Sequence, residues 1–379
     1  MKRIGVITIY TEPNYGSALQ AYATQTILEQ LGYDCKIIRY KYPNEWNHEQ
    51  GYPKSNILRR FVRSLGLKYY HKKANRLKSF IKENFHLTRE FKNLKELESY
   101  DWNKNFDVVA VGSDQVWNYR YLYGDSAYLL SFLPDGFKRI SIASSFACKE
   151  IVPKYCDKYL KHLSKFSAFS VRESFGETIL KKQLGLKQYT KIVLDPTLLL
   201  TAEQWLTAIK EKELNRVKGK KYILLYGLYY AFEPRPYIFE LLRYYKEKLG
   251  YEIVALEGYT CPKDCGGLKM IDCTDSSLYE FIYLFHHAEL VVTSSFHGTA
   301  FALNFSKPLV SVVPDNGIDD RLSSLLRLVG ADNCAVAKGS SFEGISPFYD
   351  ISEVTGSLER LRRDCKDYLQ EMIDGNKLN

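Results

Sequence analysis

The strongest constraint on the fold is the alternation of short apolar runs with amphipathic stretches along almost the whole chain. Each apolar run has the length of a β-strand, and the stretches between them have the apolar spacing of helices. Strands that alternate with helices pair in parallel and are joined by right-handed crossovers. The 379-residue sequence therefore predicts an α/β protein with largely parallel sheets.

The expected strands form two groups, with a break near residue 200. The first group comprises Arg3 to Ile9, Asp34 to Arg39, Asp107 to Val111, Arg139 to Ser145, Ser167 to Val171 and Lys191 to Leu194, and the second comprises Lys221 to Tyr226, Tyr251 to Leu256, Glu289 to Thr293 and Leu309 to Val313. Between them, Asp195-Pro-Thr interrupts the pattern and Thr201-Ala-Glu-Gln starts a capped helix. We predict two Rossmann-like domains facing a cleft, residues 1–200 and 201–350, and a final helix, 351–379, that could cross back to the first domain.

Hydropathy and cysteine usage exclude several classes of protein. No apolar run reaches the roughly 18 residues of a membrane span, and the run from Ile4 to Tyr10 is too short for a secretory signal. The eight cysteines are scattered, and the one group, Cys261, Cys265 and Cys273, lacks a fourth ligand for zinc. We expect reduced thiols, no metal site and a cytoplasmic location.

Positive charge is concentrated in one segment. The net charge is +9, and residues 54–82 hold ten Lys and Arg with no Asp or Glu, so the rest of the chain is nearly neutral. Apolar residues recur at helical spacing through this segment, which predicts two amphipathic helices with basic outer faces. We expect a basic helical insertion over residues 54–92.

In parallel α/β sheets, ligands bind where the strands end at their carboxyl edge. After the first expected strand, Asn14-Tyr15-Gly16-Ser17 opens a helix that should stop at Gly32. Free N–H groups at a helix start favour an anion or several hydroxyls, and a glycine permits close backbone approach. These four residues are candidates for contact with a ligand; alternatively, Asn14 or Ser17 only caps the helix. The spacing differs from the glycine pattern of a dinucleotide site.

The segment after the third strand has the composition of a sugar site. Ser113 is followed by Asp114, Gln115, Trp117 and Asn118. Carboxylate and amide groups can hold sugar hydroxyls while an indole stacks on the apolar face of the sugar ring. The alternative is that Ser113 or Asp114 caps the next helix and Trp117 packs inside the core.

Two arginines are candidates for binding an anion. Arg172 follows the fifth expected strand, and Arg321 begins a later helix. A guanidinium in such a place can hold a carboxylate or phosphate through two hydrogen bonds. The alternatives are an ion pair between Arg172 and Glu173, and an exposed Arg321 paired with a nearby carboxylate. Lys307, before the last strand, is a cation in reserve.

The most informative segment runs from Thr293 to Ala300. An apolar strand leads there into small hydroxyl residues, a histidine and a glycine, namely Ser294, Ser295, His297, Gly298 and Thr299. An imidazole beside the amides of a helix start can exchange protons with a substrate near neutral pH. The alternative is a buried histidine bonded to a backbone carbonyl.

Together these blocks resemble the polysaccharide pyruvyl transferase family. The resemblance rests on Asn14 to Ser17 with Leu19 to Tyr22, Val111 to Asn118, Ser141 to Phe146, Ser170 to Glu173, Leu194 to Thr197, and Thr293 to Ala300 with Arg321. It implies a glycosyltransferase-B-like fold and transfer of the carboxyethylidene group of phosphoenolpyruvate onto two hydroxyls of one sugar, giving a cyclic ketal. One position departs from the family, because many members have Arg where this chain has Phe296.

The resemblance gives each candidate residue a role. His297 and Asp114 would be catalytic, because they could move protons to the methylene carbon and from the sugar hydroxyls. The expected donor-binding residues are Arg172, Arg321, Ser294, Ser295, Gly298 and Thr299, and the expected acceptor-binding residues are Asn14, Tyr15, Gly16, Ser17, Gln115, Trp117 and Asn118. The scheme needs no metal and no cofactor besides phosphoenolpyruvate as co-substrate.

The resemblance also suggests partners. Acceptors of the family look like intermediates of capsule, exopolysaccharide or wall glycan assembly, often on a lipid carrier at the inner membrane face. The basic segment 54–82 could then dock on anionic lipid, as a peripheral contact. Two rivals are a nucleotide-sugar-dependent glycosyltransferase of the same architecture and a nucleic-acid binder. The nearly neutral remainder of the chain and the lack of a recognised module disfavour nucleic acid.

Overall fold

The computed structural model describes residues 1–12, 14–40, 72–122, 124–229, 232–257, 265–315, 317 and 320–375. The chain divides into two compact units. Unit 1 comprises Met1–Leu67, Lys78–Leu199 and Leu361–Asn379, and unit 2 comprises Lys68–Leu77 and Leu200–Arg360. Each unit has its own parallel sheet and its own apolar core.

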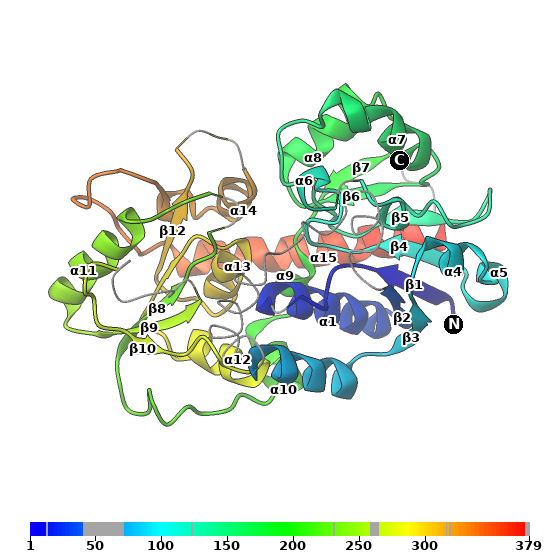
Figure 1. Ribbon diagram of the computed structural model, residues 1–379. Coiled ribbons are helices and arrows are strands. Elements are labelled where there is room, and N and C mark those ends of the chain that lie inside the picture. Colours follow the sequence, from blue (N-terminus) through cyan, green and yellow to red (C-terminus); the bar gives the residue numbers. More distant parts are fainter. Residues whose placement is uncertain are drawn as a thin grey trace, which may run out of the picture. The chain divides into compact units, whose positions relative to one another are not determined.

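Unit 1 contains a five-stranded parallel sheet in the order β3-β2-β1-β4-β5 (Figure 1). Its strands are β1 (Arg3–Ile7), β2 (Asp34–Tyr40), β3 (Leu87–Phe91), β4 (Val108–Val111) and β5 (Arg139–Ser141). Two further strands, β6 (Phe169–Val171) and β7 (Thr190–Ile192), pair in parallel with each other. Single bridges from Ile140 to Ala168 and from Ser144 to Val171 continue the order from β5 to β6. This is the strand order of a Rossmann-like fold.

Unit 1 also contains helices between and after its strands. They are α1 (Tyr15–Gln30), α4 (Leu94–Glu98), α5 (Trp102–Asn105), α6 (Tyr119–Leu122), α7 (Pro153–Leu163), α8 (Ser174–Thr178), α9 (Pro196–Leu199) and residues 361–374 of α15 (Ile351–Asp374). Before α1, the side chain of Asn14 accepts a hydrogen bond from the Gly16 N–H, and after it Gly32 adopts a φ of 87°. An asparagine cap and a left-handed glycine are common helix ends, so the bounds of α1 follow from its sequence.

Unit 2 contains a six-stranded parallel sheet in the order β10-β9-β8-β11-β12-β13. Its strands are β8 (Tyr222–Tyr226), β9 (Glu252–Glu257), β10 (Ile271–Asp272), β11 (Leu290–Thr293), β12 (Leu309–Val313) and β13 (Ala335–Ala337), and its helices are α10 (Ala202–Ala208), α11 (Tyr237–Leu249), α12 (Leu278–His286), α13 (Phe296–Asn304), α14 (Arg321–Val329) and the start of α15. Every residue of β8, β11 and β12 is buried, as in strands covered on both faces. The predicted α/β class with two Rossmann-like units is confirmed.

Three strands were not expected from the sequence, and each lies at an edge of its sheet: β3, β10 and β13. An edge strand is covered on fewer sides, so it needs no continuous apolar run. β10, for example, has two residues, both only partly buried. β3 also corrects the expected helical insertion over 54–92, because residues 87–91 pair with β2.

The end of α15 is bonded to several segments of unit 1. Arg362 Nε donates to the Leu198 carbonyl at 2.7 Å, and the Tyr368 hydroxyl donates to the Phe169 carbonyl at 2.8 Å. The Lys2 ammonium donates to the Ile373 carbonyl at 3.1 Å. Residues 164 to 371 positions apart in the chain are thus held together within this unit.

Two further findings concern hydropathy and thiols. Among the described residues, no helix combines the length and apolar character needed to span a membrane. Seven cysteines lie in the described part of the chain, and all seven are free thiols.

Part of the basic segment is paired with carboxylates of unit 2. Residues 54–71 lie outside the described residues, whereas residues 72–84 are helical. Lys72 Nζ binds the Asp275 carboxylate, and Arg76 Nη1 donates to Glu280 Oε2 at 2.9 Å. Arg216 Nη2 donates to Asp275 Oδ1 at 2.6 Å. Lys72 and Arg76, which the sequence placed on a basic outer face, are therefore engaged by acidic side chains of this chain.

We expect Asp275→Asn to destabilise the protein by about 1.5–3 kcal/mol at pH 7, because two cations lose a charged acceptor. Burial raises the pKa of Asp275, but hydrogen bonds from Lys72 and Arg216 outweigh burial and lower that pKa below its ordinary value of 3.8. A carboxyl group with a lowered pKa stabilises the fold above the unfolded-state pKa, and this stabilisation is lost as the pH falls through the folded-state pKa. The difference in unfolding free energy between wild type and variant should therefore shrink below pH 3.8.

Urea unfolding monitored by circular dichroism measures both effects. Glu213→Gln is the matched control, because Glu213 forms a solvent-exposed ion pair with Lys218 at 3.0 Å. The Glu213 side chain is 47% exposed and the Lys218 side chain 64%. An exposed pair contributes little, so this control should unfold like wild type. Equal losses in the two variants would contradict the prediction.

Candidate functional site

A network of charged side chains lies at the carboxyl ends of the strands of unit 1. Asp114 follows β4, Arg172 follows β6 and Asp195 follows β7. Arg172 Nη1 donates to Asp195 Oδ2 at 2.8 Å, and Nη2 donates to Asp114 Oδ1 at 3.4 Å. Glu173 Oε2 lies 3.9 Å from Arg172 Nε. One guanidinium therefore faces three carboxylates.

This position corrects the predicted role of Arg172. The sequence placed it as a clamp for an anionic donor, but its side chain is 1% exposed and binds carboxylates of this chain. A buried carboxylate without a counter-charge costs several kcal/mol. The guanidinium thus neutralises Asp195 and Asp114. This agrees with the alternative prediction of an internal ion pair, but the pair includes more carboxylates than that of Glu173.

Asp195 is the central residue that sequence reasoning missed. Its Oδ2 accepts hydrogen bonds from Arg172 and from the Ser113 hydroxyl, the latter at 2.7 Å. Its Oδ1 accepts from the backbone N–H and the hydroxyl of Thr197, at 3.0 and 2.7 Å. In the sequence, Asp195-Pro-Thr is visible as an interruption of the strand pattern and as part of the family block Leu194 to Thr197, but neither signal gave Asp195 a role. The structure shows that it joins β7, α9 and β4.

Asp114 is the carboxylate of this network with the most solvent contact, since 10% of its side chain is exposed. Its φ of 73° lies in the left-handed region, which Asp adopts more readily than most residues. The Ser17 hydroxyl donates to Oδ2 at 2.6 Å, and the Gln115 N–H donates to Oδ1 at 2.8 Å. The structure thus brings together two predicted residues, Ser17 and Asp114, which are 97 positions apart in the sequence.

Trp117 corrects a second prediction. Its side chain is fully buried and packs against the rings of Phe146, Phe166 and Phe169, with centroids 5.0 to 6.1 Å away. Its indole N–H donates to the Tyr128 carbonyl at 3.0 Å. A large ring in such a place contributes apolar burial to the core. Trp117 is therefore a core residue and offers no face for a sugar.

The other predicted acceptor residues lie beside Asp114 or at the start of α1. Asn14 is the cap of α1, and its Oδ1 accepts from the Gly16 N–H at 2.9 Å. Tyr15 is buried. Gln115 and Asn118 are also buried, and Asn118 Nδ2 donates to Gln115 Oε1 at 2.7 Å. The capping alternative thus holds for Asn14.

In unit 2, the predicted donor residues lie at the end of β11 and the start of α13. The Ser294 hydroxyl donates to the Leu228 carbonyl at 3.0 Å and accepts from the Leu228 N–H at 3.1 Å. The hydroxyls of Thr299 and Ser311 are 2.7 Å apart. The Ser294 bonds join the segments that follow β8 and β11, whereas the Thr299 hydroxyl joins α13 to the middle of β12.

Gly298 is required by close packing at the same place. A Cβ at this residue would lie 2.2 Å from Thr293 Oγ1 and 2.9 Å from Tyr226 Cδ1. Thr293 Oγ1 cannot easily move, because it donates to the Tyr226 carbonyl at 2.6 Å and accepts from the Ser295 N–H at 3.0 Å. Ser295 in turn caps α13 by accepting from the Gly298 N–H at 3.3 Å. The helix start therefore lies directly over the end of β11.

His297 lies in the first turn of α13 and is 5% exposed. The ring of Phe296, at the position where many family members have Arg, meets the imidazole edge-on with centroids 5.4 Å apart. A helix start favours negative charge through its free N–H groups and its dipole. This arrangement could hold an anion beside the imidazole.

The two cations named for unit 2 lie at different edges of its sheet. Arg321 begins α14, which follows the carboxyl end of β12. Its side chain is buried, whereas the alternative prediction was an exposed arginine. Lys307 precedes β12 and so lies at the amino edge, away from the end of β11. Burial lowers the pKa of Lys307, and Glu289 partly offsets this shift. Arg321 is therefore the better placed candidate for an anionic donor.

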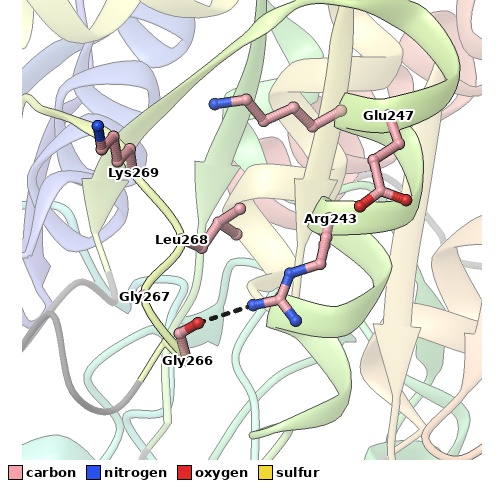
Figure 2. Close-up of a pocket in the computed structure, with 7 residues that line it drawn as sticks. Arg243, Glu247, Gly266, Gly267, Leu268 and Lys269 are labelled. Carbon is pink, nitrogen blue, oxygen red and sulfur yellow. Dashed lines mark hydrogen bonds between the residues drawn. The ribbon is translucent and has the colours of Figure 1, made fainter.

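A pocket of about 550 Å³ lies against α11 in unit 2 (Figure 2). Its lining comprises Arg243, Lys246, Glu247, Gly266, Gly267, Leu268 and Lys269. Arg243 Nη2 donates to the Gly266 carbonyl at 2.9 Å. None of the predicted site residues lines this pocket, so it is separate from the strand ends described above.

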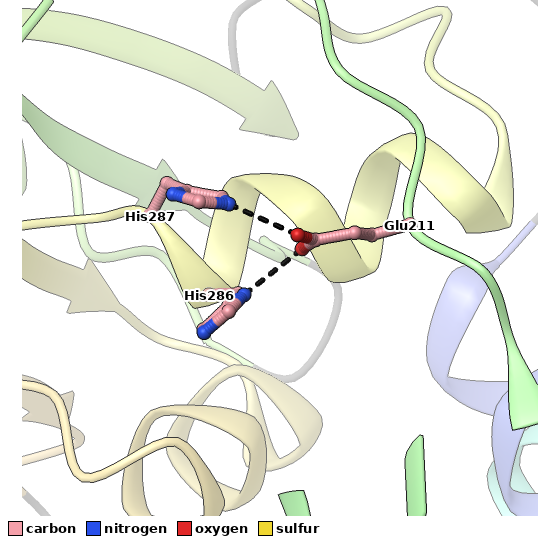
Figure 3. A group of neighbouring side chains, drawn as sticks. All are labelled: Glu211, His286 and His287. Carbon is pink, nitrogen blue, oxygen red and sulfur yellow. Dashed lines mark hydrogen bonds and ion pairs between the residues drawn. The ribbon is translucent and has the colours of Figure 1, made fainter. Parts of the chain in front are cut away.

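One group of side chains could hold a metal ion, although the sequence predicted no metal site. Glu211, His286 and His287 place their ligand atoms within 4.8 Å of one another (Figure 3). All three belong to unit 2 and none is a cysteine. In the sequence, the adjacent histidines were the only visible signal, because Glu211 lies 75 residues away from His286.

Comparison with known sequences identifies one family. Residues 14–316 match the sequence profile of a family described as polysaccharide pyruvyl transferase. The match includes the ends of β4, β6, β7 and β11 and the start of α13. No curated protein matches the chain.

Among solved structures, the chain is similar to UDP-N-acetylglucosamine 2-epimerases. The enzyme from Neisseria meningitidis bound to UDP-GlcNAc has a TM-score of 0.53 at 11% identity, over 99% of this chain and 100% of the other. A putative enzyme from Listeria monocytogenes has a TM-score of 0.54 at 12% identity, over 98% and 90%. At these identities the likeness shows the fold, which is glycosyltransferase-B-like.

We expect Arg172→Met to destabilise the protein by about 3–5 kcal/mol, because it leaves the buried carboxylates of Asp114 and Asp195 without their counter-charge. Arg172→Lys keeps the positive charge but cannot bind two carboxylates through separate N–H groups of one planar guanidinium. It should therefore lower the unfolding free energy by less than Arg172→Met does. Urea unfolding gives both values. A stable Arg172→Met variant that has lost only ligand affinity would show that the guanidinium binds substrate after all. Arg120→Met, at an exposed arginine, is the control and should leave stability unchanged.

Proposed function

Because the chain belongs to the polysaccharide pyruvyl transferase family, we propose that it transfers the carboxyethylidene group of phosphoenolpyruvate onto two hydroxyls of one sugar. The acceptor is a precursor of a surface polysaccharide, and the product is a cyclic pyruvate ketal. The observation that carries the proposal is the family match over residues 14–316, which includes polar strand ends in both units. Phosphoenolpyruvate is a co-substrate, and the scheme uses no other cofactor.

The donor is assigned to unit 2. Phosphoenolpyruvate carries a carboxylate and a phosphate, so its site needs positive charge or free N–H groups. The start of α13 supplies N–H groups, and Arg321 supplies a guanidinium at the same sheet edge. Ser294, Ser295, Gly298 and Thr299 set the backbone around the helix start. Because Arg172 is committed to internal carboxylates, Arg321 carries more of the donor recognition than the sequence implied.

The acceptor is assigned to unit 1. Its strand ends present hydroxyl, amide and carboxylate groups, and Asp114 is the carboxylate that reaches solvent. An anionic edge of this kind suits the hydroxyls of a sugar, which can donate hydrogen bonds to it. Asn14, Tyr15, Gly16, Ser17, Gln115 and Asn118 surround or support this edge. Trp117 is not included in the proposed acceptor site, because its side chain is buried in the core.

The reaction follows from the chemistry of the enol. His297, as imidazolium, gives a proton to the methylene carbon, which becomes a methyl group, and leaves an oxocarbenium-like centre at the neighbouring carbon. One sugar hydroxyl adds to that carbon and loses its proton to Asp114 or to the neutral His297. The bond to phosphate then breaks, and the second hydroxyl adds at the same carbon. Its proton leaves with the inorganic phosphate, so the ketal and phosphate balance the two substrates.

A nucleotide-sugar-dependent glycosyltransferase is the second candidate. The observation that favours it is the fold, because the similar enzyme from Neisseria meningitidis was solved bound to UDP-GlcNAc. This candidate predicts that UDP raises the melting temperature of the protein and phosphoenolpyruvate does not. The preferred function predicts the reverse, so one thermal-shift series separates the two.

We also propose that the protein is cytoplasmic and that its basic segment 54–82 contacts the inner face of the membrane. A lipid-linked acceptor would be available there. Ten cations without an acidic residue support this contact. Lys72 and Arg76 already bind Asp275 and Glu280, so residues 54–71 should contribute most of the attraction.

The proposed activity predicts phosphate release that depends on an acceptor. Purified protein with labelled phosphoenolpyruvate and a panel of nitrophenyl or lipid-linked sugars should form inorganic phosphate and an acid-labile sugar adduct together. His297→Asn should lower kcat by about 100-fold or more, because the proton transfer to carbon is lost. His86→Asn is the matched control, since His86 pairs with Glu29 at 2.7 Å in unit 1 and should not affect turnover.

Two results would contradict the proposed activity. One is phosphate release that is the same with and without sugar. The other is a His297→Asn variant that unfolds like wild type and turns over at the wild-type rate.

The membrane contact predicts co-sedimentation with vesicles containing anionic lipid at low salt, and release at high salt, because screening weakens surface charges. Reversing Arg59, Arg60 and Arg63 to Glu should abolish binding. Reversing Lys104, Lys154 and Lys187, three exposed cations of unit 1, is the control with the same change in net charge. Wild-type protein that stays in the supernatant at low salt would refute the contact.

A further inference from the structure

Two neighbouring imidazoles and one carboxylate converge in unit 2 (Figure 3). His286 Nδ1 lies 2.9 Å from Glu211 Oε2, and His287 Nε2 lies 3.2 Å from Glu211 Oε1. We propose that Glu211, His286 and His287 form a binding site for one divalent transition-metal ion, of which Zn²⁺ is the best match. This site is independent of the proposed transferase reaction.

The spacing of the ligand atoms fits such an ion. A tetrahedral Zn²⁺ with bonds of about 2.0–2.1 Å keeps its ligand atoms about 3.3 Å apart. The two nitrogen-to-oxygen distances, 2.9 and 3.2 Å, are close to this value, and all the ligand atoms lie within 4.8 Å. Small side-chain rotations would therefore admit the ion. Each imidazole only has to carry its proton on the nitrogen that faces away from Glu211.

The two imidazoles are held by their surroundings. The ring of His287 packs on that of Tyr283 with centroids 4.3 Å apart, and the His287 N–H donates to the Tyr283 carbonyl at 3.0 Å. The ring of His286 lies 5.6 Å from that of Phe305. Ligands that are fixed before binding lose less conformational freedom when the ion arrives.

The segment that carries Glu211 is also anchored. The backbone N–H of Lys212 donates to the Tyr279 carbonyl of α12 at 3.2 Å. This bond keeps residue 211 alongside the helix that ends at His286. The position of the backbone therefore brings the carboxylate close to the imidazoles, in addition to the attraction between the side chains.

The charges at the site favour a cation. Among the described residues, the ion-pair partners of Glu211 are the two histidines, and no Lys or Arg neutralises it.

The ligand types select the kind of metal. Imidazole nitrogen suits Zn²⁺, Co²⁺ and Ni²⁺, whereas Mg²⁺ and Ca²⁺ prefer sites made of oxygen. The three side chains are 30% to 42% exposed, so water can complete the coordination. The site would join the segment between α10 and β8 to the end of α12, at the amino edge of the sheet. His297 lies at the opposite edge, after the carboxyl end of β11. We therefore expect the ion to affect the stability of the protein and not the proposed reaction.

The test is titration of untagged, metal-free protein with Co²⁺, followed by visible absorption, and with Zn²⁺, followed by calorimetry. We expect one equivalent to bind, with a weak visible spectrum that lacks a thiolate charge-transfer band. Glu211→Gln, His286→Gln and His287→Gln should each weaken binding about tenfold or more. Zn²⁺ should raise the melting temperature of wild type and not that of Glu211→Gln, since an ion that binds the folded state stabilises it.

His86→Gln is the matched control, because His86 and Glu29 form a pair with one imidazole instead of two. It should bind the ion like wild type. The proposal is overturned if no stoichiometric binding occurs, or if the control weakens binding as much as the three variants do. Binding with a thiolate spectrum that survives all three variants would also overturn it, because the ion would then lie on cysteines.

Discussion

The carboxyl edge of the unit 1 sheet depends on one buried guanidinium. Arg172 lies between Asp114 and Asp195, with Glu173 close by. Without it, three carboxylates would share a space that is almost closed to water, at a cost comparable to a large part of the stability of a domain. Since one guanidinium faces three carboxylates, the edge keeps a surplus of negative charge. Such an edge suits a hydroxyl-rich acceptor better than an anionic donor.

The corresponding edge of unit 2 is organised by hydroxyls and a glycine. Thr293, Ser294 and Ser295 bind backbone groups, and Gly298 lets α13 start directly over β11. The start of α13, which holds His297, and the buried Arg321 at the start of α14 are positive features of this edge. At the opposite edge, Glu211 and the two histidines join neighbouring segments. The donor half of the proposed reaction and the proposed metal site are therefore assigned to opposite edges of one sheet.

How much of the fold could be predicted depended on burial. The central strands are apolar because both faces are covered, so the sequence located them within a few residues. The edge strands β3, β10 and β13 are short or partly exposed, and they were missed. Strand ends were also overextended: the expected strand Arg139 to Ser145 stops at Ser141, and Ala143 then turns the chain with a φ of 51°.

The sequence by itself determined the α/β class, the starts of helices such as α1 and α10, and the family, because these depend on local spacing and on short motifs. Only the tertiary structure decided what the polar and aromatic residues do. Arg172 meets Asp195 across 23 residues, and Glu211 meets His286 across 75. Whether a charged group faces a ligand or a partner inside the protein depends on which distant segments the fold brings beside it, and burial makes such pairing necessary.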